Sequence, residues 1–180
     1  AMGYKALKIE VLGQAAPAEA GTNVEILENN FYKIVIDKAT GSISSLIDKE
    51  MNQELADGQN LYDIGQPVRE TINNRRQMTP TQTTVSNVKV DAGTNGPVWE
   101  SVRIASDLAG FEKGTDGSPK GIELEIRLYK NVKKIEFKYL AHKGILTDPE
   151  ALYVAFRFLL PGLRVVFETI GGILTQGQQL

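Results

Sequence analysis

Hydrophobic and polar side chains alternate most clearly in residues 31–48. The alternation breaks at 37–41, where Asp37 can bond its own backbone and Gly41 can adopt a positive φ. A period of two on both sides of such a break predicts a β-hairpin. The residues that share one face are Tyr32, Ile34 and Ile36 before the turn, and Ile43, Ser45 and Ile47 after it.

The same alternation returns after residue 84 and continues towards the end of the chain. Its clearest strand is 122–128, which pairs with 135–139 in a second predicted hairpin that turns tightly at Lys130 and Asn131. Opposite charges face each other on the polar side of this hairpin, so we expect them to pair across the strands. Further strands are predicted at 88–90, 98–104, 152–158 and 165–167.

No segment shows the helical period over a useful length, and strands do not alternate with helices. We therefore predict an all-β fold in which antiparallel sheets pack face to face as a β-sandwich. We expect a single domain over 1–180, with an N-terminal strand and linker in 1–23 and the main sandwich in 24–180.

Residues 67–82 contain Arg69, Arg75 and Arg76 and have little apolar periodicity. They are predicted to form a long surface loop. The alternative is a role at an interface or near a sugar.

The charge and composition of the chain mainly exclude certain partners and kinds of site. The chain has 20 Lys and Arg against 22 Asp and Glu, a net charge of -2, with no long run of either sign. Nucleic acids and anionic membranes attract clustered basic patches, so neither is an expected partner. The chain has no cysteine and a single histidine, His142. A metal site built from this chain alone is therefore not expected.

Acidic residues are the first candidates for chemistry, because two suitably separated carboxylates would serve glycoside hydrolysis. Asp37 and Asp48 flank the first hairpin, and Asp148 with Glu150 precedes a predicted strand. Acids beside turns and prolines are ordinary, however, and the structural interpretation is favoured for them.

The single imidazole and the single indole are the other candidates. His142 has no positioned nucleophile or second ligand in the sequence, so we interpret it as a surface or loop side chain. Trp99 could stack on a sugar ring or cap a second sheet, and the packing role is favoured.

Several stretches carry a family resemblance. The most specific is 27–32, Leu-Glu-Asn-Asn-Phe-Tyr, followed by the Asp-x-x-Thr-Gly-x-Ile-x-Ser-Leu-x-Asp pattern of 37–48. Shorter similar stretches are 3–5, 96–99, 126–129 and 150–158, the last with Arg157 in place of a proline. On these residues the chain resembles the C-terminal β-rich region of glycoside hydrolase family 38, the α-mannosidases.

The resemblance implies a sandwich of the galactose-mutarotase-like type, as a fragment of a larger multidomain glycosidase. The implied partner is the catalytic barrel of the same polypeptide, which in the family carries an aspartate nucleophile and a zinc ion and acts on mannose-containing glycans. None of those motifs occurs in these 180 residues. We therefore expect an accessory domain that shapes the cleft, without catalytic residues or cofactor of its own, and with Glu150 and Trp99 as candidates for substrate contact.

Two other functions stay open. A stand-alone carbohydrate-binding module would bind mannose by itself. A mutarotase or epimerase would need a convergent histidine and acid inside the sandwich, which a single histidine disfavours.

Overall fold

The computed structural model describes residues 19–20, 25–58, 61–72, 76, 79–111, 121–142, 149–162, 166–169 and 172–175. Within these ranges all regular structure is β, which confirms the predicted all-β class. The strands are β1 (Glu19–Ala20), β2 (Ile26–Glu28), β3 (Tyr32–Asp37), β4 (Ser42–Asp48), β5 (Gln53–Glu54), β6 (Pro67–Ile72), β7 (Pro80–Thr84), β8 (Ser86–Asn95), β9 (Trp99–Asp107), β10 (Gly121–Tyr129), β11 (Ile135–His142), β12 (Glu150–Val154), β13 (Val166–Thr169) and β14 (Gly172–Thr175).

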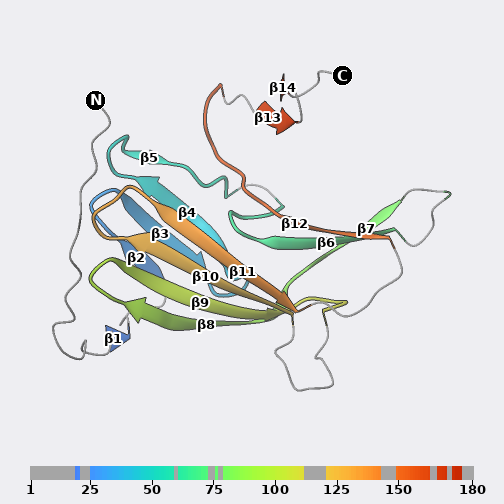
Figure 1. Cartoon of the computed structure of the whole chain (residues 1–180), viewed down its shortest axis with the longest axis horizontal. Helices are drawn as coiled ribbons and strands as arrows, with labels where there is room; N and C mark the ends of the chain where they lie inside the picture. Colours follow the sequence, from blue (N-terminus) through green and yellow to red (C-terminus); the bar gives the residue numbers. More distant parts are fainter. Residues whose placement is uncertain are drawn as a thin grey trace, which may run out of the picture.

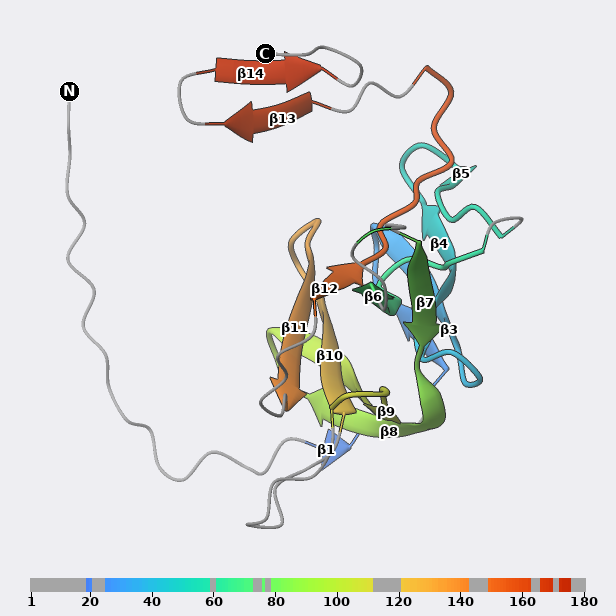
Figure 2. The ribbon, with the colours of Figure 1, turned by 90° about the vertical axis from the view of Figure 1, so that its right-hand side faces the viewer.

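Two antiparallel sheets form the layers of a sandwich (Figure 1). One is four-stranded, in the order β2-β3-β4-β5, and the other is five-stranded, in the order β1-β8-β9-β10-β11. A three-stranded sheet, β12-β6-β7, lies near them, while β13 and β14 pair with each other as a hairpin that lies apart (Figure 2). The N-terminal strand expected within 1–23 lies almost entirely outside the described residues.

The core lies between the two main sheets, because each turns one apolar face inward. Ile34, Ile43, Ile126 and Leu128 are completely or almost completely buried there. The other buried members of this cluster are Leu27, Ile36, Leu46, Leu55, Ala56, Ile64, Val102, Ile104 and Leu124.

The first predicted hairpin is confirmed as β3 and β4. In its turn, the carboxylate of Asp37 accepts a hydrogen bond from the Ala39 amide at 2.8 Å, and Gly41 has a φ of 66°. One detail differs from the sequence pattern. The register shifts between Val35 and Ile36, so a bulge in β4 turns Leu46 inward where strict alternation predicted Ile47.

A buried carboxylate ties the two sheets together at one end. Asp48, at the end of β4, is 2% exposed. It accepts hydrogen bonds from the amides of Glu50 at 3.0 Å and Met51 at 3.1 Å. Its other oxygen lies 2.8 Å from Nζ of Lys133, which belongs to the turn between β10 and β11. Asp48 therefore has a structural role.

The second predicted hairpin is confirmed as β10 and β11, and its connection includes Lys130 and Asn131 as predicted, but it is longer than a tight two-residue turn. The strands part at the Leu128–Ile135 pair, which leaves a longer connection. A hydrogen bond of 3.2 Å from the Tyr129 amide to the Lys134 carbonyl closes this connection. A longer connection is what lets Lys133 reach Asp48.

The prediction that 67–82 forms a surface loop is also wrong. The segment contains β6 and the start of β7, and β6 pairs with both β7 and β12. Their hydrogen bonds satisfy the backbone of β6 on both sides, so this strand forms without strict apolar alternation. The strand predicted at 152–158 is shorter than expected, since β12 ends at Val154.

Replacing Gly41 with alanine tests the hairpin turn. A left-handed φ costs a residue with a side chain about 1–2 kcal/mol. The new Cβ would also lie 2.6 Å from Cγ2 of Ile104. We expect Gly41→Ala to lower the free energy of unfolding by about 2 kcal/mol or more in urea titrations. Gly96→Ala is the matched control, because its nearest neighbour would lie at 3.7 Å. Equal losses in the two variants would contradict this account.

The Asp48–Lys133 contact makes stability depend on pH. The hydrogen bond from Lys133, aided by the Met51 amide, holds the pKa of Asp48 below its ordinary value. A folded pKa below the unfolded one stabilises the protein above the unfolded pKa, and this stability is lost as the pH falls through the folded pKa. We therefore expect Asp48→Asn to lower the urea midpoint at pH 7, with the difference from wild type shrinking as the pH falls below about 5.

The control for this experiment is Asp91→Asn. Asp91 forms an exposed ion pair with Lys89, and such pairs contribute little. A difference between wild type and Asp48→Asn that stays constant from neutral to acidic pH would show that the charge of Asp48 is not what matters.

Candidate functional site

Trp99 begins β9 on the outer face of the five-stranded sheet, directly opposite Tyr129 of β10. The two ring centroids are 5.8 Å apart. The guanidinium of Arg127 lies 5.2 Å from the centroid of the Trp99 ring. The indole therefore contacts an aromatic ring and a cation, which are favourable partners for it. Both partners belong to the same sheet as Trp99, whereas the packing role favoured from the sequence placed the ring against a second sheet.

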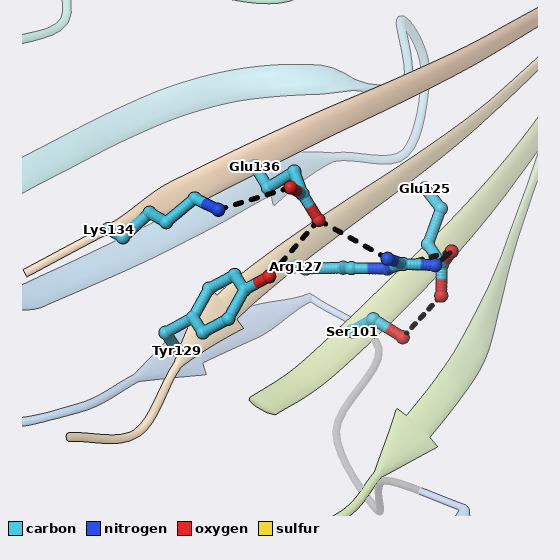
Figure 3. Close-up of polar contacts among 6 residues, drawn as sticks. All are labelled: Ser101, Glu125, Arg127, Tyr129, Lys134 and Glu136. Carbon is cyan, nitrogen blue, oxygen red and sulfur yellow. Dashed lines mark hydrogen bonds and ion pairs between the residues drawn. The ribbon is translucent and has the colours of Figure 1, made fainter. Parts of the chain in front are cut away.

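Beside Trp99, polar side chains of β9, β10, β11 and the connection between β10 and β11 form a connected row, which we call the charge ladder (Figure 3). Arg127 is at its centre. It donates to Oε2 of Glu125 from Nε at 3.0 Å and from Nη2 at 2.7 Å, and to Glu136 from Nη1 at 3.2 Å. The ladder consists of Ser101, Glu125, Arg127, Tyr129, Lys134 and Glu136.

These contacts keep both carboxylates of the ladder ionised. Burial acts to raise the pKa of Glu125, but the hydrogen bonds from Arg127 and Ser101 outweigh it, so this pKa lies below its ordinary value. The hydrogen bond from Lys134 is the main reason that the pKa of Glu136 is also lowered. Neither residue is suited to hold a proton near neutral pH, so the ladder is not a general-acid site.

A cavity of about 430 Å³ opens on the same outer face, next to the ladder. We call it the outer trough. Residues of four adjacent strands line it: Asp91, Arg103, Ile104, Ala105, Glu123, Leu124, Glu125, Lys138 and Leu140. Glu125 belongs to both groups. The sequence had indicated the outward charges of β10 and β11, but the place of Asp91 and Arg103 beside them depends on sheet order, which the pattern of one strand does not reveal.

Glu150, the other candidate, lies in a different place. Its Oε2 accepts a hydrogen bond from Nε of Arg69 at 2.8 Å, and the two side chains are only 9% and 13% exposed. A cavity of about 140 Å³ adjoins this ion pair, lined also by Phe111, Ala141, Ala151 and Leu152. Glu150 thus links β12 to β6 where the three-stranded sheet meets the end of the sandwich.

The structure does not bring Trp99 and Glu150 together. Trp99 is at the start of β9. The Glu150 cavity lies at the other end of this strand: Ala141, which lines the cavity, is in register with Ile122 and, through it, with Ser106 near the end of β9. Seven residues separate Trp99 from Ser106, or roughly 23 Å along a strand. A single sugar unit therefore cannot contact both residues.

His142 ends β11, with its Nε2 at 3.6 Å from Glu123. This Nε2 atom is buried and has no hydrogen-bond partner among the described residues, although the side chain as a whole is 21% exposed. His142 thus lies in a strand and not in a loop, with its side chain partly exposed. Within the described ranges, no group of three His, Asp or Glu side chains is placed to hold a metal ion. The same part of the chain contains no helix that is long and apolar enough to cross a membrane.

Comparison with protein families gives a match over residues 27–177 to the C-terminal domain of glycosyl hydrolases family 38. The match covers most of the chain. The chain belongs to this family. The resemblance carried by 27–32 and 37–48 is thereby confirmed. A comparison with curated protein sequences found no match.

Membership in the family 38 C-terminal domain makes the chain an accessory part of a glycosyl hydrolase. The carboxylates of the charge ladder bond a central arginine, and Glu150 bonds Arg69, so these acids serve the fold.

The ion pair of this family 38 domain can be tested by removing one partner. Arg69→Ala leaves the Glu150 carboxylate buried without its guanidinium, which typically costs about 3–5 kcal/mol. We expect the free energy of unfolding to fall by about that amount in chemical denaturation. The double variant Arg69→Met/Glu150→Leu removes both charges and should recover most of the loss. A double variant as unstable as Arg69→Ala would show that packing, and not charge, is lost.

Proposed function

We propose that this domain is the accessory β-sandwich of a family 38 α-mannosidase and packs against the catalytic barrel of the same polypeptide. Its role is to hold that barrel and to form part of the cleft that receives a mannose-containing glycan. Family membership supports the enzyme class. The choice of the barrel as partner rests on an exposed apolar surface that the sandwich does not cover.

This surface lies on residues 152–159, which we call the apolar segment. Its large hydrophobic side chains are 38–53% exposed: Leu152, Tyr153, Phe156, Phe158 and Leu159. Exposed single hydrophobic residues are ordinary, but five within eight residues are typical of an interaction surface.

The apolar segment is fixed to the sandwich, so its exposure does not come from fraying. The Ala155 amide donates to the carbonyl of Gln66 at 2.9 Å, and the Leu159 amide donates to the carbonyl of Leu55 at 2.8 Å. The rings of Phe156 and Phe137 meet edge to face at 5.2 Å. Held in this way, the exposed side chains form a pre-organised surface that needs little ordering on binding.

A groove of about 240 Å³ runs beside the apolar segment. Phe156 and Phe158 form one side of it, and the remaining lining is almost entirely apolar: Tyr32, Leu46, Leu55, Ile64, Ile135 and Phe137. A groove of this composition suits the apolar side chains of a permanently attached protein domain better than a polar ligand. The catalytic part of the enzyme is such a partner.

Co-expression tests both parts of the proposal. The 180-residue chain alone should hydrolyse an aryl α-mannoside no faster than buffer does, whereas the chain with the parent enzyme's catalytic region should form a stable, active complex. Tyr153→Ser/Leu159→Ser should weaken this association at least about tenfold, because two buried apolar contacts are lost. The measurement is capture of the catalytic region by the tagged chain at graded concentrations.

The matched control is Leu61→Ser/Val132→Ser. It removes two other exposed hydrophobic side chains, which are 74% and 56% exposed and lie outside the apolar segment. This variant should bind the catalytic region as the wild type does. Hydrolysis by the chain alone, or equal weakening by both double variants, would refute the proposal.

A further inference from the structure

The outer trough contains two cations on either side of a fixed carboxylate. In the register of the sheet, Glu125 of β10 pairs with Arg103 of β9 on one side and with Lys138 of β11 on the other. One oxygen of Glu125 accepts a hydrogen bond from the Ser101 hydroxyl at 3.0 Å, and the other accepts one from Nη2 of Arg127 at 2.7 Å. This carboxylate therefore has a defined position. Its remaining lone pairs are able to accept further hydrogen bonds.

Arg103 and Lys138 are exposed. Arg103 lies between Asp91 and Glu125 in the register of the sheet, and its charge attracts the Glu125 carboxylate. Across the described part of the chain, neither makes a hydrogen bond or an ion pair, although both lie beside Glu125. Arg103 alone brings five N–H donors in a planar arrangement, and Lys138 brings three more. The trough therefore presents hydrogen-bond donors and acceptors side by side, and its two basic side chains form no hydrogen bond within the described residues.

The balance of charge selects a neutral ligand. The acids Asp91, Glu123 and Glu125 face the bases Arg103 and Lys138, so neither sign dominates the lining. An anion would meet three carboxylates, and a cation would meet two basic groups. A neutral molecule with adjacent hydroxyl groups, each both donor and acceptor, matches this lining without such repulsion.

Two apolar side chains lie at one end of the trough. Ala105 and Leu140 lie on the two sides of Glu123 in the register of the sheet. Leu140 is 51% exposed. Together they offer a surface against which the C–H face of a sugar ring can pack. The volume of about 430 Å³ lies within the range of small-molecule sites, roughly 300–1,000 Å³.

We propose that the outer trough binds a single hexopyranose unit of a glycan, through Arg103, Glu125 and Lys138 on its hydroxyl groups and Leu140 on its ring. This gives the domain a sugar site built from its own residues. It rests on the proposed function only for the choice of mannose as the first sugar to test.

The test uses ¹H–¹⁵N correlation spectra of the 180-residue chain, titrated with methyl α-mannoside to tens of millimolar. We expect saturable shifts of amides in β9, β10 and β11 around Arg103, Glu125 and Lys138. Arg103→Ala and Lys138→Ala should each weaken binding about tenfold, because each removes hydrogen bonds from a charged donor. Both residues are exposed, and unchanged circular dichroism would show that the variants fold.

Lys38→Ala is the matched control, since Lys38 is an exposed lysine of the β3–β4 turn, outside the trough. It should bind the sugar as the wild type does. Titrations with glycerol and with inorganic phosphate are run in parallel. Shifts that do not saturate, shifts located elsewhere, equal shifts with glycerol, or binding of phosphate alone would each overturn the proposal.

Failure of this proposal is distinguishable from failure of the proposed function. The trough variants lie outside the apolar segment, so they should not affect capture of the catalytic region. Conversely, Tyr153→Ser/Leu159→Ser should leave the sugar titration unchanged.

Discussion

Burial of one face of each main sheet against the other is the constraint on which the rest of the structure depends. Ile34 and Ile43 from one sheet and Ile126 and Leu128 from the other form a core that excludes water. Because side chains alternate along a strand, every inward residue fixes an outward neighbour. The charge ladder and the outer trough therefore lie on the outer face of the sheet whose inner face forms the core. The packing of that core fixes the strands from which their side chains project.

The sequence predicted those parts of the fold that depend on alternation within one segment. Both hairpins were found in this way, because their strands lie next to each other along the chain. The structure of 67–82 was missed, since β6 is stabilised largely by backbone pairing with β12, which follows about 80 residues later in the sequence. The bulge that turns Leu46 inward was missed because a single inserted residue leaves little trace in a pattern of serines and isoleucines.

The candidate site was less predictable than the fold. Glu150 was singled out from its place before a strand, but its role is set by Arg69, which is 81 residues away in the chain. The partners of Trp99, Tyr129 and Arg127, belong to another strand of the same sheet, so the sequence around Trp99 does not reveal them. The outer trough requires residues from four strands in a particular order. Sheet order is a property of the whole fold, so no single motif contains it.

The order of the five-stranded sheet also places β11 at its edge within the described structure. An edge strand presents unpaired backbone groups to which a strand of another molecule can add. Here Glu136 and Lys138 alternate along that strand, and β-strand addition would force these charges against those of the incoming chain. Glu136 of the charge ladder and Lys138 of the trough are thus charges of the kind that disfavour pairing between sheet edges. The exposed apolar side chains of 152–159 and the charged side chains of this edge are therefore two surfaces of opposite character on one domain.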